Sequence, residues 1–185
     1  MPDIGSTSFG IAFSHYSLPN GTIMSQFELA QINIARFALP KEHAANAPFM
    51  AALDDVNAKA EASPGFVWRL VGEGNNATDV EAVPDDPLLI VNMSVWRDIA
   101  SLGAFAYRNS KHLSVMRRKH EWFEPMEVSF ALWWVPQGHR PSVADGMARL
   151  AVLASRGPST EAFTFRTPFA APCGSIDVAS HPERL

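Results

Sequence analysis

His112 is the residue in this chain whose type and setting most strongly suggest chemistry. If residues 110–123 (SKHLSVMRRKHEWF) form a helix at 100° per residue, the residues within about 60° of His112 are Val115, Met116, Lys119 and Phe123. An imidazole on such an apolar stripe needs a partner, because a buried unpaired polar group costs about 1–3 kcal/mol. It could act as a general base or as the axial ligand of a haem iron. It could equally be a core histidine hydrogen-bonded to a backbone carbonyl, to Tyr107 or to Asn92.

Further candidates stand in segments that are expected to border His112. Tyr107 and Arg108 end the preceding helical segment, where a phenol could orient a substrate and a guanidinium could hold an anionic group; with His112 they form the predicted catalytic group. Arg69 follows an indole in an expected strand and is a second anion anchor. The other predicted substrate contacts are Trp68, Asn92, Trp96, Met116, Trp122 and Trp134. Plain core packing would explain these rings as well as a ligand cavity does.

Regular elements must position these residues. Apolar runs predict strands over 27–37, 66–71, 88–96 and 130–135, and apolar residues spaced by three and four predict helices over 49–60, 99–106, 110–123 and 142–156. Asp98 is an expected N-cap, and Ser142 with Asp145 resembles a capping box. The expected apolar face of the last helix carries Met147, Leu150, Ala151 and Ala154. Residues 160–172 are expected to form an edge strand or a docking arm.

The element order is strand, helix, strand, strand, helix, strand, helix. This order is the α+β, ferredoxin-like βαββαβ pattern with an extra C-terminal helix. An antiparallel sheet with its helices on one face would leave the other face bare, and that face would carry rings such as Trp68, Trp96, Trp133 or Trp134. Because a bare aromatic face invites a partner, we predict a two-fold homodimer, a dimeric α/β barrel in which each sheet covers the other.

Composition narrows the function classes. The chain has 185 residues, 15 basic against 19 acidic, and a net charge of −4, which disfavours nucleic-acid binding. A single cysteine offers no intrachain disulfide, so a cytoplasmic setting is expected. We find no apolar run long enough to span a bilayer and no glycine-rich phosphate motif, so no bound nucleotide is expected. The predicted division is a flexible N-terminal extension (1–24), one barrel domain (25–170) and a C-terminal tail (171–185).

Several long stretches match a known family. SVWRDIASLGAFAYRNSKHLSVMRRKHEWFEPM, ALWWVPQGHRPSVADGMARL, LAQINIARF and SPGFVWRL resemble the bacterial and fungal family called domain of unknown function 3291, over about residues 26–165. That family is grouped with dimeric α/β barrel proteins and is distantly similar to spheroidene monooxygenase, a carotenoid-oxidising protein thought to depend on haem. The resemblance implies the barrel fold. It also implies oxygenase chemistry and haem as a cofactor, with His112 as the residue that would hold the iron.

Two functions follow from the residues and the resemblance together. The first is a small-molecule enzyme, monooxygenase-like, that acts on an apolar or aromatic substrate in a hydrophobic cavity. The second is a noncatalytic ligand-binding or stress-related dimer in which His112 is structural. The sequence does not decide between them, because barrels of this kind host many unrelated activities.

Overall fold

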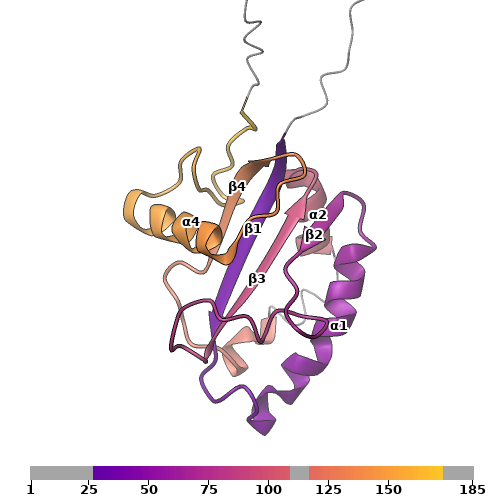
Figure 1. Cartoon of the computed structure of the whole chain (residues 1–185), viewed down its shortest axis with the longest axis vertical. Coiled ribbons are helices and arrows are strands. Elements are labelled where there is room, and N and C mark those ends of the chain that lie inside the picture. Colours follow the sequence, from indigo (N-terminus) through magenta and orange to yellow (C-terminus); the bar gives the residue numbers. More distant parts are fainter. Residues whose placement is uncertain (1–26, 109–116, 173–185) are drawn as a thin grey trace, which may run out of the picture.

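The computed structural model describes residues 27–108 and 117–172 and contains one four-stranded antiparallel sheet (Figure 1). The strands are β1 (Phe27–Arg36), β2 (Phe66–Arg69), β3 (Leu89–Trp96) and β4 (Phe130–Pro136). Their order across the sheet is β2-β3-β1-β4, so β3 and β1 are the central strands. This order, with antiparallel pairing throughout, is that of a ferredoxin-like sheet. The predicted fold class is confirmed.

The helices are α1 (Ala47–Glu61), α2 (Ile99–Arg108) and α4 (Val143–Arg156), with short 3-10 turns η1 (Ala44–Asn46) and η2 (Lys119–Glu121). Asp98 caps α2 as predicted, because its carboxylate accepts a hydrogen bond from the Ser101 amide at 2.7 Å. Burial raises the pKa of Asp98. This bond and those from the Ser101 and Arg97 side chains together lower the pKa by more than burial raises it, so it lies below the ordinary value. The anchored start of α2 fixes where the helix meets β3.

Strand alternation divides the sheet into two faces. In β1, Ala30, Ile32 and Ile34 point to one face, where they join Val91, Met93, Val95, Ala131, Trp133 and Val135 in a buried core. Helix α4 supplies Leu150 and Leu153 to this core, and we call it the α4-side core. The other face carries Leu29 on β1 and Trp96 on β3, with Ala60 of α1 and Leu102 of α2. The α1/α2 pair and α4 therefore lie on opposite sides of the sheet.

The expected bare face does not exist in the single chain. Ala30, Ile32, Met93 and Val95 are fully buried under α4 and under apolar side chains of the loop between β2 and β3. Helix α4 comes close because Gly146 faces the sheet, where a Cβ atom would lie 2.6 Å from Ile32 Cδ1. The buried side of α4 is Gly146, Leu150 and Leu153. Ala151 and Ala154, predicted for that side, are exposed.

Two other segments differ in detail from their predicted bounds. Strand β2 ends at Arg69, two residues before the predicted end. Of the helix expected over 110–123, residues 110–116 lie outside the described part; Arg117 and Arg118 are helical, and the chain then tightens into η2. The segment after α4 docks through an isolated bridge between Phe163 and Leu132 of β4, as an arm.

None of the helices in the described ranges is long and apolar enough to cross a membrane.

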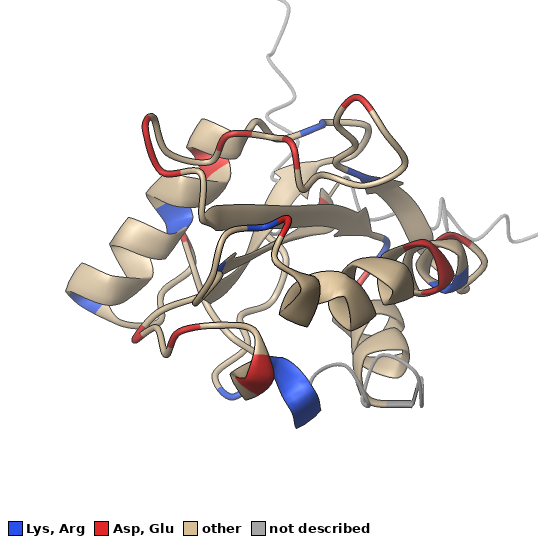
Figure 2. Ribbon diagram, turned by 90° about the horizontal axis from the view of Figure 1, so that it is seen from below, with Lys and Arg blue, Asp and Glu red and all other residues tan. Residues whose placement is uncertain are grey.

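Charged groups are spread over separate elements. Figure 2 shows the Lys and Arg segments dispersed among helices and loops, with Asp and Glu segments between them. Arg36 pairs with Asp86 and Glu124, and Arg118 pairs with Glu121, so several cations have an acidic neighbour. The absence of a nucleic-acid partner stays a prediction.

A capping box fixes the start of α4. The capping box is formed as predicted: Asp145 Oδ2 accepts from the Ser142 amide and hydroxyl at 2.9 and 2.7 Å, and the Asp145 amide donates to Ser142 Oγ at 3.2 Å. We expect Ser142→Ala to lower the free energy of unfolding by about 1 kcal/mol at pH 7. Urea denaturation measures this. Ser155→Ala, on an exposed turn of the same helix, should change little.

The effect of Ser142→Ala should depend on pH. The hydrogen bonds from the Ser142 side chain and backbone hold the pKa of Asp145 below its ordinary value of 3.8. A carboxylate with a lowered folded-state pKa contributes stability above its unfolded pKa, and this contribution is lost as the pH falls through the folded pKa. The difference between wild type and Ser142→Ala should therefore narrow below about pH 4. A constant difference down to pH 2 would show that the Asp145 charge adds nothing to the cap.

Candidate functional site

A group of polar side chains occupies the centre of the sheet on the face toward α1 and α2. Its members are Gln31 and Asn33 on β1, Asn92 and Ser94 on β3, and Arg69 on β2, and we call them the polar strip. Strand pairing places Arg69 opposite Ser94, Ser94 opposite Gln31, and Asn92 opposite Asn33. Residues directly opposite in antiparallel strands share a face and lie about 5 Å apart at their Cβ atoms. The strip is therefore contiguous across three strands.

Asn92 is the exposed member of the strip. Every other residue of β3 is buried, and Asn92 stands alone as exposed in the middle of this central strand. A central strand is covered by hydrogen bonds on both edges, so its side chain can reach solvent only if the sheet face above it is open. The described residues leave this part of the sheet face uncovered.

Hydrogen bonds tie the strip together. The Gln31 amide nitrogen donates to Asn92 Oδ1 at 2.8 Å and to Ser94 Oγ at 3.0 Å. The Trp96 indole nitrogen also donates to Ser94 Oγ, at 2.8 Å. The Asn33 amide donates to the Ser129 carbonyl at 3.1 Å. These bonds hold Asn92 and Ser94 in fixed orientations on the face.

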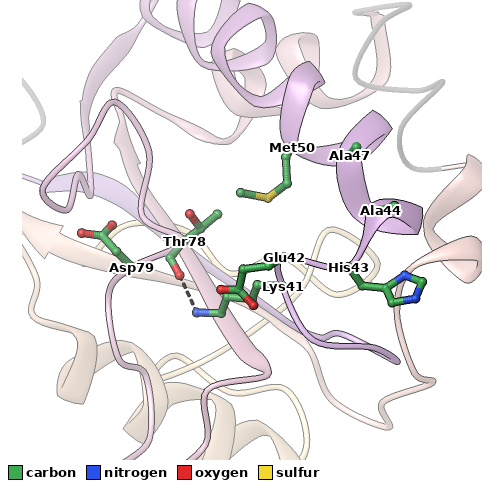
Figure 3. A pocket seen from close by; sticks show the side chains of 8 residues that line it. All are labelled: Lys41, Glu42, His43, Ala44, Ala47, Met50, Thr78 and Asp79. Carbon is green, nitrogen blue, oxygen red and sulfur yellow. Dashed lines mark hydrogen bonds between the residues drawn. The ribbon is translucent and has the colours of Figure 1, made fainter.

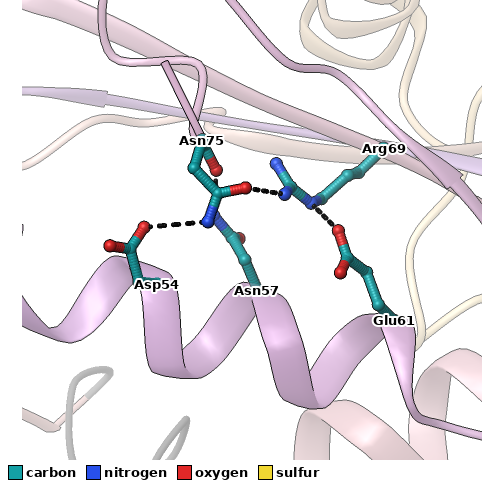
Figure 4. Close-up of polar contacts among 5 residues, drawn as sticks. All are labelled: Asp54, Asn57, Glu61, Arg69 and Asn75. Atoms are coloured by element: carbon teal, nitrogen blue, oxygen red, sulfur yellow. Dashed lines mark hydrogen bonds and ion pairs between the residues drawn. The ribbon is translucent and has the colours of Figure 1, made fainter.

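Arg69 is buried at the β2 end of the strip, with 8% of its side chain exposed. Its Nε donates to Glu61 of α1 at 2.7 Å, and its Nη2 donates to Asn75 Oδ1 at 2.9 Å. Asn75 is itself held by Asp54 and by Asn57 of α1 (Figure 4). Nη1 is buried and has no hydrogen-bond partner among the described residues. Because buried polar groups are normally hydrogen-bonded, this nitrogen is a donor that can bind an additional acceptor.

Aromatic residues flank the strip on both sides. The Trp96 cluster contains Trp96, Leu29, Leu102, Leu132 and Phe163, with Phe105 stacked on Trp96 at 5.2 Å between ring centroids. The Trp122 cluster contains Trp122, Phe37, Phe49 and Ile90. Helix α1 runs past both, with Ala60 in the first, Phe49 in the second, and the polar Asn57 between them. The sheet face toward α1 and α2 thus has a polar middle between two apolar ends.

The structure brings together only some of the predicted site residues. Arg69, Asn92 and Trp96 lie on one face as neighbours, and Trp134 lies on the same face, its indole bonded to the Phe169 carbonyl at 2.9 Å. Trp68 packs in the α4-side core, on the opposite face. Trp122 is buried in its own cluster, beneath the guanidinium of Arg118 at 5.0 Å. A single ligand on the polar strip could not contact Trp68.

The remaining predicted residues lie at or beyond the end of α2. Tyr107 is 61% exposed, and its ring meets Phe165 edge-on at 5.4 Å. Arg108 is the last residue of α2, and its side chain is outside the described part. His112 and Met116 are also outside the described residues, so their predicted roles stay predictions. Among the residues that the structure describes, no group of His, Cys, Asp and Glu could hold a metal ion.

Sequence reasoning missed Gln31, Asn33, Ser94 and the partners of Arg69. A signal for the first three was present. In FELAQINIAR, polar Gln31 and Asn33 alternate with Ala30, Ile32 and Ile34, and in LIVNMSVW polar Asn92 and Ser94 alternate with Val91 and Met93. Two predicted central strands with polar residues at every second position indicate a polar patch on one sheet face. Glu61 and Asn75 could be found only from the fold.

A surface pocket of about 490 Å³ lies elsewhere, between the start of α1 and the loop after β2 (Figure 3). Its lining includes Lys41, Glu42, His43, Met50 and Asp79, and Lys41 donates to the Thr78 carbonyl at 2.5 Å. The lining has no aromatic ring other than the imidazole of His43. No predicted site residue is part of it.

The fold and the site define a ferredoxin-like α+β protein with the polar strip on the sheet face toward α1 and α2. The family model described as "Domain of unknown function (DUF3291)" matches residues 28–178, so the chain belongs to this family, as the resemblance predicted. A comparison with curated proteins gives no match.

Solved structures with a similar fold include two bacterial proteins. A protein from Pseudomonas aeruginosa is 17% identical, with a TM-score of 0.43; the match covers 63% of this chain and 98% of that one. SnoaB from Streptomyces nogalater, described as a cofactor-independent oxygenase, is 16% identical, with a TM-score of 0.42 and coverage of 62% and 98%. Likeness at this level carries no argument about activity.

Proposed function

We propose that this protein is a small-molecule enzyme, monooxygenase-like, whose apolar or aromatic substrate lies on the polar strip. The observation that carries the proposal is the exposed Asn92 in the middle of β3, where every other residue is buried. A sheet centre that served only packing would be apolar, because polar groups there cost free energy unless they are paired. The strip therefore fits a binding surface better than a packing surface.

The shape of the surroundings suits a flat ring system. The Trp96 cluster and the Trp122 cluster stand on either side of the strip, and their own rings are buried. The partly buried rings packed against them, Phe105 and Phe123, are the ones that offer apolar contact, while the amides and the guanidinium offer directed hydrogen bonds. Ligand sites in proteins typically combine apolar walls with a few fixed polar groups. This combination supports a substrate with an aromatic body and one or two oxygen atoms.

The group that would move a proton is not in the strip. Amide, hydroxyl and guanidinium groups do not change protonation near neutral pH, and Glu61, the nearest carboxylate in the network, is bound to Arg69. His112 is the proposed base, which keeps the role expected from the sequence. In this proposal the strip binds and orients the substrate, and the imidazole performs the proton transfer.

Haem is the cofactor that the family resemblance suggested. The described residues do not supply an axial ligand in the strip: His43, His120 and His139 are exposed and lie outside the strands. His112, which lies outside the described residues, is therefore kept as the proposed iron ligand. Absorption spectra of protein from haem-supplemented cells test this: a Soret band that is lost in His112→Ala supports haem, and a colourless protein that takes up no haemin removes it.

A noncatalytic binding protein is the second candidate. It is favoured by the composition of the strip, which offers donors and acceptors but no titrating group. Extraction of the bound molecule from purified protein, followed by mass spectrometry before and after incubation with oxygen, separates the two functions. A gain of oxygen that requires the intact protein supports the enzyme. A ligand recovered unchanged supports the binding protein.

A cytoplasmic homodimer remains part of the proposal. Because α4 and the loop after β2 cover the sheet face once expected to pair, a second copy would have to use another surface or displace these segments. Light scattering coupled to size-exclusion chromatography measures the mass in solution. The mass of a monomer at micromolar concentration would contradict the proposed dimer.

The binding proposal predicts a specific effect of Asn92→Leu. We use 2-naphthamide, a neutral flat aromatic amide, as the probe and follow quenching of the intrinsic tryptophan fluorescence. The leucine removes the exposed amide and fills the open patch, so the dissociation constant should rise at least about tenfold, the equivalent of one lost hydrogen bond. Because residue 92 is exposed, the unfolding midpoint should change little.

Gln137→Leu provides the matched control. It replaces an exposed amide with the same side chain, but in the turn after β4 and away from the strip. Its affinity for 2-naphthamide should equal that of the wild type. If Asn92→Leu binds the probe as well as Gln137→Leu does, the strip is not the proposed site.

A further inference from the structure

Two side chains on β3 keep unpaired hydrogen-bond donors in the polar strip. An indole nitrogen can only donate, so Ser94 Oγ accepts from Trp96, and it accepts from the Gln31 amide as well. Asn92 Oδ1 accepts from the same Gln31 amide. The acceptor atoms of Ser94 and Asn92 are thus engaged. Among the contacts of the described residues, the Ser94 hydroxyl hydrogen and the Asn92 amide nitrogen have no acceptor.

Arg69 adds the charge to this set of donors. Its Nε and Nη2 are held by Glu61 and Asn75, and Nη1 is the nitrogen left without a partner. In Figure 4 this third nitrogen points away from α1. Arg69 and Ser94 are directly paired across β2 and β3, and both lie on the face toward α1 and α2. Arg69 Nη1 and the free donors of β3 therefore lie on the same face of the sheet, where Nη1 and Ser94 are buried and Asn92 is exposed.

The partners of Arg69 hold it in place without cancelling its charge. Glu61 is 49% exposed, so water screens its attraction for the guanidinium more than the protein interior would. Asn75 is neutral. Glu61 and Asn75 are positioning residues, because they occupy one edge of the guanidinium and leave Nη1 for another acceptor.

We propose that the polar strip recognises an anionic oxygen on its aromatic ligand, such as a carboxylate, phenolate or enolate, bound by Arg69 Nη1, the Ser94 hydroxyl and the Asn92 amide. This inference rests on the proposed function and adds the chemical class of the ligand. A cationic ligand is disfavoured, because it would face a buried positive charge. Hydrogen bonds between a charged donor and a charged acceptor are about twice as strong as neutral ones.

The experiment compares two probes that differ only in charge, 2-naphthoate and 2-naphthamide, on the full chain at pH 7. Isothermal titration calorimetry gives both dissociation constants. The wild type should bind 2-naphthoate at least about tenfold more tightly. Arg69→Met should abolish this preference, so that its dissociation constants for the two probes lie within about twofold of each other. Arg36→Met, which removes an arginine paired with Asp86 and Glu124 elsewhere, should retain the preference.

Asn92→Asp is the second variant, and it keeps the proposal testable if Arg69→Met does not fold. The substitution is nearly isosteric at an exposed position, so the fold should be unaffected. The new carboxylate repels an anion, so the affinity for 2-naphthoate should fall at least about tenfold more than the affinity for 2-naphthamide.

The outcomes separate the two proposals. Equal affinity of the wild type for both probes, or an anion preference that survives both Arg69→Met and Asn92→Asp, overturns the anionic ligand and leaves the proposed function standing. Failure of both probes to bind the wild type contradicts the proposed function itself. Tight binding of 2-naphthoate that is weakened equally by Arg36→Met places the anion site away from the strip and also overturns the inference.

Discussion

Trp96→Ala is expected to lower the free energy of unfolding by about 3–5 kcal/mol, the usual cost of removing a buried indole from a core. Trp96 is 1% exposed and is the largest fully buried side chain among the described residues. Its ring stacks on Phe105 and meets Phe66 edge-on at 5.3 Å. The alanine would leave a cavity between β3 and α2. Chemical denaturation followed by circular dichroism gives the free energy.

Trp96→Phe separates the ring from the indole nitrogen. Phenylalanine keeps most of the aromatic contact but cannot donate to Ser94 Oγ, so the loss of stability should be clearly smaller than for alanine, about 1–2 kcal/mol. It also leaves a lone pair of Ser94 Oγ without a donor. Because this lone pair repels an anionic oxygen, the affinity for a ligand anion should fall. Tyr107→Ala, at an exposed ring of α2, is the control and should change stability little. A Trp96→Ala variant as stable as Tyr107→Ala would contradict the packing described for β3 and α2.

Gly146→Leu is expected to destabilise the protein by about 3 kcal/mol through overpacking. A Cβ atom on residue 146 would lie 2.6 Å from Ile32 Cδ1, 3.2 Å from Met93 Sδ and 3.3 Å from Ile32 Cβ. The end of the Ile32 side chain could move for an alanine, but a leucine adds three carbon atoms where β1 and β3 already touch α4. The helix would have to shift away from the sheet. The unfolding midpoint in urea is the measurement.

Two variants of the same helix make the Gly146 result specific. Ala148→Leu places the same side chain on the exposed side of α4 and should change stability by about 0.5 kcal/mol at most. In Gly146→Ala, the gain in helix propensity of about 1 kcal/mol opposes the cost of moving Ile32 Cδ1 away from the new Cβ atom, so the net change should be smaller than for leucine. If Gly146→Leu were as stable as Ala148→Leu, α4 would not pack on the sheet at this residue.

The residues that decide a local structure could be interpreted from the sequence. Ser142 and Asp145 satisfy each other within three residues of chain, so the start of α4 was predictable without knowledge of its partner. Asp98 capped α2 for the same reason. The strand positions followed from apolar runs, and the element order then restricted the topology to the ferredoxin-like sheet.

The candidate site was predictable only in part. Arg69, Asn92 and Trp96 were named from their residue types and do lie on one face. Trp68, the neighbour of Arg69, was named with them but packs on the other face, since side chains alternate along β2. The register irregularity between Phe66 and Trp68 sets which of these residues faces the helices. Pairing with β3 is a long-range contact, and no short sequence pattern encodes it.

The sequence by itself determined the α+β class, the family, the helix caps and the alternation that puts polar residues in two central strands. Only the tertiary structure decided that α4 covers the sheet face once expected to be bare, and that Glu61 and Asn75 hold Arg69 with one nitrogen free. The physical reason is the range of the interactions. Caps and periodicity depend on neighbours within one or two turns, whereas the close approach at Gly146 and the ring of bonds around Arg69 join segments that meet only after the chain has folded.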